Sequence, residues 1–184
     1  IELQAIITSI IKNLGMEHGD FIIECTPLPT HTLSAHGKEN ITFLISANPG
    51  LPAKSITKIA SGGELSRISL AIQVATSHDK TIPTMIFDEV DSGIGGGVAE
   101  IVGQRLRQLG EKRQVICVTH LPQVASQSHH HLFVSKEHSI DVTASNITAL
   151  TTAQRIKEIA RMLGGVTITK QTLAHAEEML QGNS

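Results

Sequence analysis

Aromatic side chains are almost absent from this sequence. It contains no Trp, no Tyr and only 4 Phe among its 184 residues, although 40% of the residues are hydrophobic. A core built from this composition must therefore be aliphatic. Because this length is typical of one domain, we expect residues 1–184 to form a single domain.

Charge is also scarce, and no long apolar run is present. Charged residues make up 17% of the chain, and the formal net charge is −2. So small a charge creates no strong field that would attract nucleic acid or a membrane surface. No stretch approaches the roughly 20 apolar residues of a membrane span. The start lacks both a basic signal-peptide segment and an initiator Met, so we expect a piece of a longer cytoplasmic protein.

Cysteine is limited to Cys25 and Cys117, which both lie in apolar runs. Buried, reduced thiols in a cytosolic protein explain this pattern better than a disulfide framework does.

The phosphate-binding pattern Gly-x-x-x-x-Gly-Lys-Ser/Thr is missing. The Gly-Lys pair at Gly37-Lys38 has Thr32 in place of the first Gly and Glu39 in place of the hydroxyl residue. The sequence therefore lacks the backbone cradle and the lysine that P-loop enzymes use to hold phosphates.

Hydrophobic periodicity predicts helices alternating with short strands. Apolar residues at helical spacing predict helices near 1–14, 62–77, 98–109, 152–163 and 170–181. Short apolar runs predict strands at 21–25, 41–47, 84–89 and 114–120, and an edge hairpin from 132–136 and 140–145. The order strand, helix, strand, helix in the middle is typical of an α/β fold with parallel strands.

The helix predicted at 62–77 starts with two glycines, within Ser61-Gly62-Gly63-Glu64. A capping box explains Ser61 and Glu64. It does not explain the glycines, each of which costs a helix about 1 kcal/mol against Ala. Glycines at a helix start let another group approach the backbone, where free N–H groups favour an anion such as phosphate. Both interpretations remain open.

Acidic residues end the predicted strand at 84–89. Asp88 could hold Mg²⁺ there, and Glu89 could orient or deprotonate a water molecule. Solvated acids at a strand end are the alternative. Asp91, in the Gly-rich loop 90–97, is either a turn or helix-cap residue or part of the same site.

Histidines and one arginine leave two interpretations each. His120 follows the strand at 114–118, where ligands bind in open α/β sheets, and is either a phosphate contact or a structural residue. Arg67 is either a packing residue or lies near a nucleotide interface. His129, His130 and His131 form either a solvated cluster or a metal site, and alternation along a strand favours the former.

These motifs occur in a fixed order: SGGE, an apolar run with DE, D-x-G-x-G-G, and TH after another apolar strand. That order resembles the second half of an ABC-type ATPase head, with its signature, Walker B acids, D-loop and switch histidine. The stretches SANPG, ASGGELSR, IFDEVDSGIGG, VTHLPQVA and IARMLGGVTIT resemble the RecN family of bacterial DNA repair proteins, relatives of the SMC proteins. The resemblance covers about residues 14–180. Thr84, where Walker B strands often have an apolar residue, is a small departure.

The resemblance implies the fold and the division of the chain. It implies an α/β fold, the C-terminal lobe of an ABC/SMC-type ATPase head, with a mostly parallel sheet flanked by helices and an edge β-hairpin. Residues 1–16 would be the end of a coiled-coil arm, and 17–184 the lobe. Walker A and the Q-loop would lie in the N-terminal half of the same head. We therefore expect the chain alone to hydrolyse no ATP.

The resemblance also implies ATP and Mg²⁺ as cofactors. Asp88 would support Mg²⁺, and Glu89 would be the general base. His120 would contact the γ-phosphate and help to align the attacking water. Asp91 would couple the two nucleotide sites of a dimer.

In the same family pattern, the signature residues act across a dimer. Ser61, Gly62 and Gly63 would contact the γ-phosphate of ATP held by a second, identical head, and Glu64 would belong to the same nucleotide-binding signature. Hydrolysis would then release the two heads from one another. The implied partners are that second head and DNA, with no membrane, and the implied setting is double-strand-break repair in the bacterial cytoplasm.

Three other functions remain open. A transporter nucleotide domain would need a surface for a membrane partner, which the sequence does not reveal. Another SMC-type head would differ in the length of its arm. A non-catalytic interaction module is the third, and the acids at 88–89 together with His120 argue against it.

Overall fold

The computed structural model describes residues 2–29, 35, 37–46, 50, 52–59, 61–76, 82–138, 143–165 and 167–182. Its helices are α1 (Glu2–Asn13), α2 (Gly62–Ala75), α3 (Gly96–Gly110), α4 (Pro122–Ala125), α5 (Thr152–Gly164) and α6 (Lys170–Gln181), with the 3-10 helix η1 at Ile56–Lys58. Its strands are β1 (Asp20–Pro27), β2 (Glu39–Ser46), β3 (Lys54–Ser55), β4 (Thr84–Phe87), β5 (Gln114–Cys117), β6 (Leu132–His138) and β7 (Thr143–Ala149).

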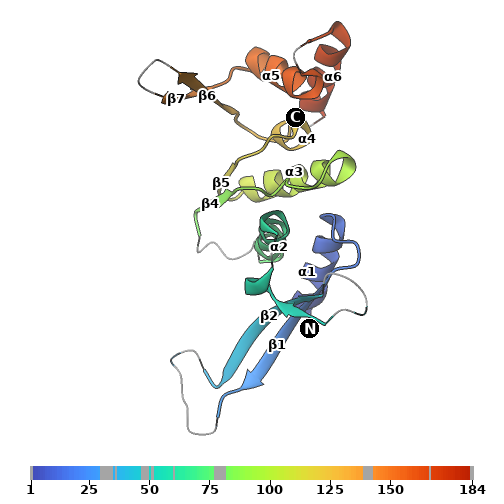
Figure 1. Cartoon of the computed structure of the whole chain (residues 1–184), viewed down its shortest axis with the longest axis vertical. Helices are drawn as coiled ribbons and strands as arrows, with labels where there is room; N and C mark the ends of the chain where they lie inside the picture. The colour runs from blue at the N-terminus through green and yellow to red at the C-terminus, as the bar shows by residue number, and fades with distance from the viewer. Residues whose placement is uncertain are drawn as a thin grey trace.

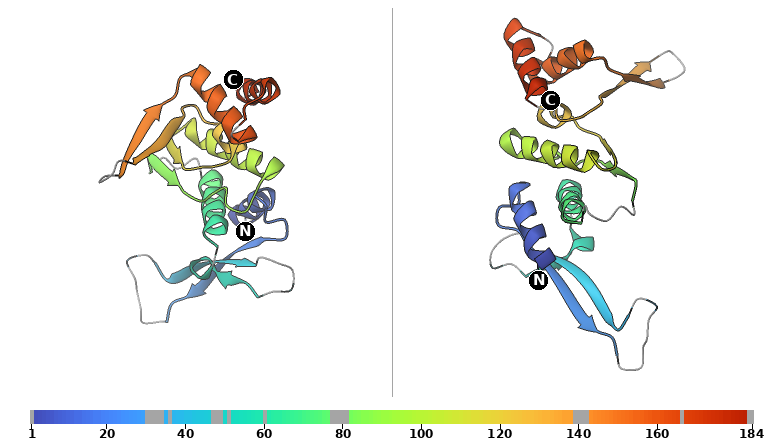
Figure 2. Two further views of the ribbon diagram at one scale, coloured as in Figure 1. Left: turned by 45° about the horizontal axis from the view of Figure 1, so that its top comes forward. Right: turned by 180° about the vertical axis from the view of Figure 1, so that it is seen from behind.

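These elements form an elongated arrangement in which α1, α2 and α3 occupy the middle (Figure 1). The antiparallel β1–β2 hairpin projects at one end, and β3 pairs with β2 near its base. Helices α5 and α6 and the β6–β7 hairpin lie at the other end. Figure 2 shows α1 and α2 side by side from further directions.

Helix α1 is hydrogen-bonded to the base of the β1–β2 hairpin. The N–H of Phe21 donates to the Thr8 hydroxyl oxygen at 3.0 Å, and the N–H of Ile23 donates to Gln4 Oε1 at 3.0 Å. Side chains on one face of the helix thus satisfy donors of an edge strand, and helix and hairpin are joined.

The α/β class predicted from the sequence is confirmed, but the prediction of a mostly parallel sheet is wrong for the described strands. Among them only β4 and β5 pair in parallel, from Thr84↔Gln114 to Phe87↔Cys117. Parallel neighbours require a crossover of a dozen or more residues. The 15-residue α3 supplies it for this pair. The other paired strands are antiparallel, and the predicted edge hairpin, β6–β7, is among them.

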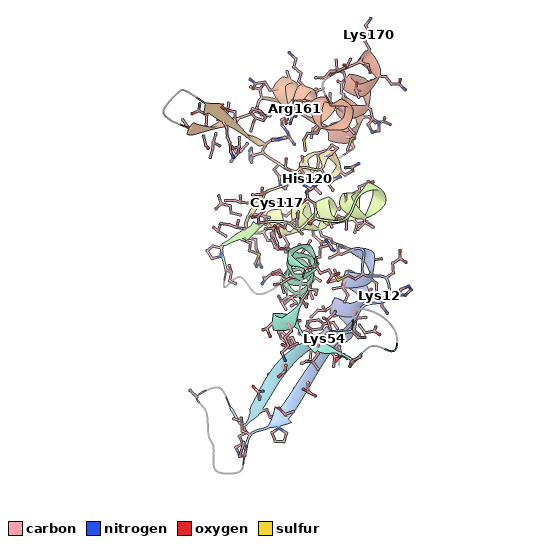
Figure 3. All side chains as sticks on the ribbon, viewed as in Figure 1. Lys12, Lys54, Cys117, His120, Arg161 and Lys170 are labelled. Carbon is pink, nitrogen blue, oxygen red and sulfur yellow. The ribbon has the colours of Figure 1, made fainter. Side chains whose placement is uncertain are left out.

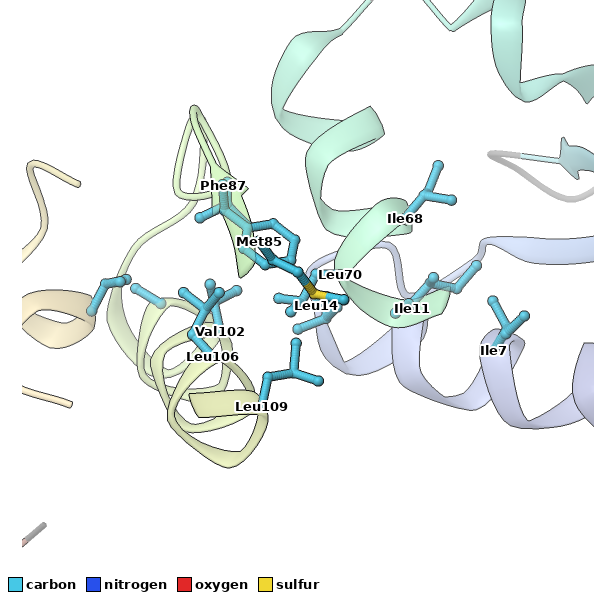
Figure 4. Close-up of a cluster of buried hydrophobic side chains, with 14 of the residues drawn as sticks. Ile7, Ile11, Leu14, Ile68, Leu70, Met85, Phe87, Val102, Leu106 and Leu109 are labelled. Carbon is cyan, nitrogen blue, oxygen red and sulfur yellow. The ribbon is translucent and has the colours of Figure 1, made fainter. Parts of the chain in front are cut away.

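The core is mostly aliphatic, as the composition predicted, although Phe21 and Phe87 are also buried in it. Figure 4 shows side chains from α1 and the turn after it, α2, β4 and α3 meeting in one cluster. The fully buried members include Ile7, Ile11, Leu14, Ile68, Leu70 and Val102. A smaller cluster joins α4 to α5 and α6 through Ala125, Ile159, Ala160 and Ala176. The larger cluster fixes the start of α2 against β4 and α3.

Some local predictions fail, and others cannot be compared with the structure. Cys25 is exposed, contrary to the prediction of a buried thiol, because the outer half of β1 has no element packed on it. Both cysteines are free, as predicted. Thr32 and most of the stretch SANPG, residues 46–50, lie outside the described residues. Among the described helices, none is long and apolar enough to cross a membrane.

Candidate functional site

Helix α2 begins at Gly62, and Ser61 caps it. The Ser61 hydroxyl oxygen accepts a hydrogen bond from the backbone N–H of Glu64 at 3.3 Å. This is the first half of the predicted capping box. The described hydrogen bonds do not include the second half, a bond from the Ser61 N–H to the Glu64 carboxylate. One of the free donors at the helix start is therefore satisfied within the chain.

Both glycines at the helix start are explained by the loop that follows β4. A Cβ atom at Gly62 would collide with Oε2 of Glu89. A Cβ atom at Gly63 would lie 2.9 Å from both the carbonyl oxygen and the Cβ of Ser92. At Gly63 the loop backbone leaves room only for hydrogen, whereas at Gly62 the neighbour is the end of the Glu89 side chain, which a Cβ atom would displace. This packing is an intrachain reason for the glycines that the sequence did not reveal.

The loop after β4 has an unusual backbone at Glu89. Its φ angle is 57°, in the left-handed region that non-glycine residues seldom adopt. The Glu89 N–H donates to Oδ1 of Asp88 at 2.9 Å, and its carbonyl accepts from the N–H of Ser92 at 3.0 Å. A turn closed by these bonds places the Glu89 carboxylate at the start of α2, where the helix dipole favours negative charge.

Two side chains of α2 hold this loop. The hydroxyl of Ser66 donates to the carbonyl oxygen of Asp88 at 2.7 Å. Arg67, which is buried, donates from Nη1 to the carbonyl of Ser92 at 2.7 Å. Burial lowers the pKa of the Arg67 guanidinium, and the Glu64 carboxylate opposes that change. These contacts support the packing interpretation of Arg67.

Asp91 joins the loop after β4 to the end of β5. Its side chain is buried, with the residue only 2% exposed. Its Oδ2 accepts from the Thr119 hydroxyl at 2.5 Å and from the His120 N–H at 3.1 Å. His120 Nδ1 lies 3.3 Å from the same oxygen. A single carboxylate oxygen therefore positions both Thr119 and His120, just beyond β5.

The His120 ring lies just beyond the end of β5, and 73% of its side chain is exposed (Figure 3). Because Nδ1 faces Asp91, Nε2 is the ring nitrogen that remains for a ligand. The ring is thus both anchored and accessible.

The strand ends are electronegative. Burial, followed by the carboxylates of Asp91 and Asp88, raises the pKa of the Cys117 thiol to about 12. The Cys117 thiol therefore stays neutral near pH 7 and is no nucleophile. The same field favours a cation near Asp88.

Within the described part of the chain, no three His, Cys, Asp or Glu side chains form a metal-binding group, so His129–His131 form none.

Every residue predicted for the site thus belongs to one connected unit. Ser61, Gly62, Gly63 and Glu64 open α2, Asp88, Glu89 and Asp91 follow β4, and His120 follows β5. No feature of the sequence indicated that Ser66 holds the loop, and packing was one of two interpretations left open for Arg67. The role of Asp91 as an internal acceptor was also not predicted, since a sequence does not show which side chain faces the core.

Curated relatives of the chain are DNA repair proteins, although no protein-family model matches it. RecN of Xylella fastidiosa is 53% identical over 174 residues, which are 95% of this chain and 31% of that protein. Over almost its whole length, this chain resembles one part of RecN. RecN of Vibrio cholerae is 51% identical over 179 residues, and RecN of Bacillus subtilis 42% over 149. The chain spans about a third of the length of these RecN proteins.

Solved structures show the fold of this RecN-like chain. One comes from work on ATP-driven dimerization and DNA-stimulated activation of SMC ATPases. It has a TM-score of 0.52 and 18% identity, and the match covers 90% of this chain and 93% of that one. An Smc head domain with a coiled coil and joint from Pyrococcus yayanosii has a TM-score of 0.59 and 17% identity, over 85% of this chain and 28% of that one. The predicted SMC-type head fold is therefore confirmed.

The substitution Gly63→Ala tests the close packing at the start of α2. The added methyl group meets the Ser92 backbone, so we expect a loss of about 1–3 kcal/mol in the free energy of unfolding. Gly97→Ala, at an open position in the first turn of α3, is the matched control and should be neutral or stabilising. Urea denaturation of both variants measures the difference. Equal stabilities would contradict the packing explanation.

The substitution Asp91→Ala tests the link between the loop after β4 and the end of β5. It leaves the Thr119 hydroxyl and the His120 N–H without their acceptor, and we expect a cost of about 1–3 kcal/mol. Asp20→Ala removes an exposed carboxylate that pairs with Lys12 and should change stability little. The same denaturation assay compares the two, and a similar small loss in both variants would exclude the link.

Proposed function

We propose that this chain is the C-terminal lobe of an SMC-like ATPase head that acts in DNA double-strand-break repair. Similarity to RecN and the SMC head fold support this proposal. The observation that carries it is the convergence of three separate motifs on one site: the start of α2, the loop after β4 and the end of β5. The full-length protein would bind ATP and Mg²⁺ and hydrolyse the nucleotide.

Asp88 fits the role of a Mg²⁺ ligand. Its side chain is exposed at a strand end, and after burial and Asp91 its charge also raises the pKa of the neighbouring Cys117. Proteins commonly hold Mg²⁺ through one or two carboxylates, with water and nucleotide phosphates completing its coordination. A single carboxylate is therefore a sufficient contribution from this lobe.

Glu89 and His120 are the proposed catalytic residues. The exposed Glu89 follows Asp88 directly, and the turn described above fixes its backbone next to the start of α2, which suits a base that takes a proton from water. Asp91 lies next to Nδ1 of His120, so Nε2 of the ring is directed to the surface. This orientation suits a contact between Nε2 and the γ-phosphate. We propose that Asp91 acts by holding His120. Its coupling of two sites across a dimer stays a prediction.

The start of α2 is proposed to meet ATP bound by a second, identical head. Ser61 and Gly62 are exposed, so a partner can reach them. N–H groups at the start of a helix bind phosphate well. ATP held between two heads would join them, and hydrolysis would separate them, opening and closing a clamp on DNA.

The N-terminal half of the same head is the proposed partner of an exposed apolar sheet face. Parallel strands are normally covered on both faces. Here Ile86 on β4, which is 70% exposed, lies beside Ile116 and Val118 at β5, and both of these are exposed too. A lobe carrying Walker A and the Q-loop would cover this face. The chain without that lobe would hydrolyse no ATP.

Glu89→Gln in the full-length protein tests the proposed base. An amide cannot accept the proton, so we expect ATP to remain bound while hydrolysis falls about 100-fold or more. Phosphate release and nucleotide retention measure the two effects. Glu111→Gln, at an exposed position after α3, is the control and should hydrolyse ATP normally. Wild-type turnover in Glu89→Gln would exclude Glu89 as the base.

Ser61→Arg tests the proposed interface between heads. The large side chain should block the approach of a second head while nucleotide binding persists. Light scattering with and without ATP, in the Glu89→Gln background, measures dimerisation. Ser69→Arg, an exposed position on the same helix, should dimerise as before. If Ser61→Arg also dimerises fully, Ser61 is only a helix cap.

A further inference from the structure

The loop between β4 and α3 is held differently in its two halves. Val90 and Asp91, in its first half, are 0% and 2% exposed. The stretch 93–97, which runs into α3, consists of glycines apart from Ile94. A Cβ atom added at any of these four glycines would meet no other atom within 4 Å. Ile94 therefore supplies the side chain that holds this second half in place.

Ile94 rests on the turn that ends α1. Its Cγ2 atom lies 3.4 Å from the position of a Cβ atom built on Gly15, and Cγ1 of Val98 lies 3.2 Å from the same position. The turn is closed onto the helix, because the N–H of Met16 donates to the carbonyl of Ile11 at 3.2 Å. Gly15 itself has a φ angle of 85°, which favours glycine. A shift of α1 therefore moves the backbone against which Ile94 packs.

Hydrogen bonds connect Ile94 to the residues proposed for catalysis. The N–H of Ile94 donates to the carbonyl of Asp91 at 3.5 Å, and the Asp91 carboxylate accepts from the N–H of His120 at 3.1 Å. In the same loop, the N–H of Ser92 donates to the carbonyl of Glu89 at 3.0 Å. A short series of direct contacts thus joins the end of α1 to both Glu89 and His120.

We propose that Ile94 is a positioning residue for ATP hydrolysis, through which the turn after α1 sets the loop that carries Glu89 and Asp91. It acts on the nucleotide only through those residues. Without the contact, the glycine-rich half of the loop relaxes, and Glu89 and His120 lose their alignment. The inference rests on the proposed function, which makes Glu89 and His120 catalytic.

Ile94→Ala in the full-length protein removes the contact, whereas Ile94→Val keeps Cγ2 and thus the contact. We expect kcat to fall about 10–100-fold in Ile94→Ala, with KM for ATP within about 2-fold of the wild type. Ile94→Val should restore most of the rate. Ile72→Ala is the matched control, because Ile72 packs half-buried against the same core from the last turn of α2. It loses similar packing and should keep its kcat.

Gly15→Ala disturbs the same contact from the side of α1, and it decides if Ile94→Ala does not fold. Gly165→Ala is its control, since Gly165 also has a positive φ angle, 67°, but a Cβ atom there meets no atom within 4 Å. Both variants strain the backbone, and only Gly15→Ala should lower kcat. In the double variant Gly15→Ala/Ile94→Ala the two losses should not multiply, because they affect one contact. Equal kcat values in the two glycine variants overturn the proposal.

Amide hydrogen exchange of the nucleotide-free protein gives a readout that does not require ATP hydrolysis. Ile94→Ala should speed exchange in the segment 118–121, where Asp91 holds the N–H of His120, and Ile72→Ala should not. Unchanged exchange there, or a kcat no lower than that of Ile72→Ala, overturns the proposal. If the wild type hydrolyses no ATP, the proposed function fails, and the exchange measurement alone decides the role of Ile94.

Discussion

Close packing of the start of α2 on the loop after β4 is the constraint on which the candidate site depends. Glycines at 62 and 63 admit Glu89 and Ser92 to the helix backbone, and Ser66 and Arg67 then hold the loop by its carbonyl groups. Asp88 and Glu89 receive their positions from this contact. A larger residue at position 62 would displace the Glu89 side chain directly, and one at position 63 would displace the loop at Ser92.

Asp91 forms a second contact on which the site depends, because it joins the loop after β4 to the residues after β5. Because its carboxylate is buried and accepts from both Thr119 and His120, neither segment can shift alone without exposing unpaired donors. Three motifs that are dispersed in the sequence are therefore coupled by direct contacts. A ligand that moves any one of them would move the others.

Long periodic elements could be predicted from the sequence, and short or tertiary features could not. The predicted ends of α2 and α6 lie within two residues of the observed ends, because the apolar residues of these helices recur at helical spacing. The four-residue α4 is too short to show a period. The motif residues were found by their order, but the intrachain role of Gly62 and Gly63 was missed. That role depends on Ser92, about 30 positions away, whose approach only the fold reveals.

The junction between α1 and the β1–β2 hairpin has a mechanical consequence. Thr8 and Gln4 tie the helix to the inner end of β1, and eight paired positions make the hairpin stiff along its length. A small rotation of α1 at that junction becomes a large displacement at the outer end, as with a lever. Cys25 is exposed on the outer half, so a dye attached there would report how the first helix is oriented.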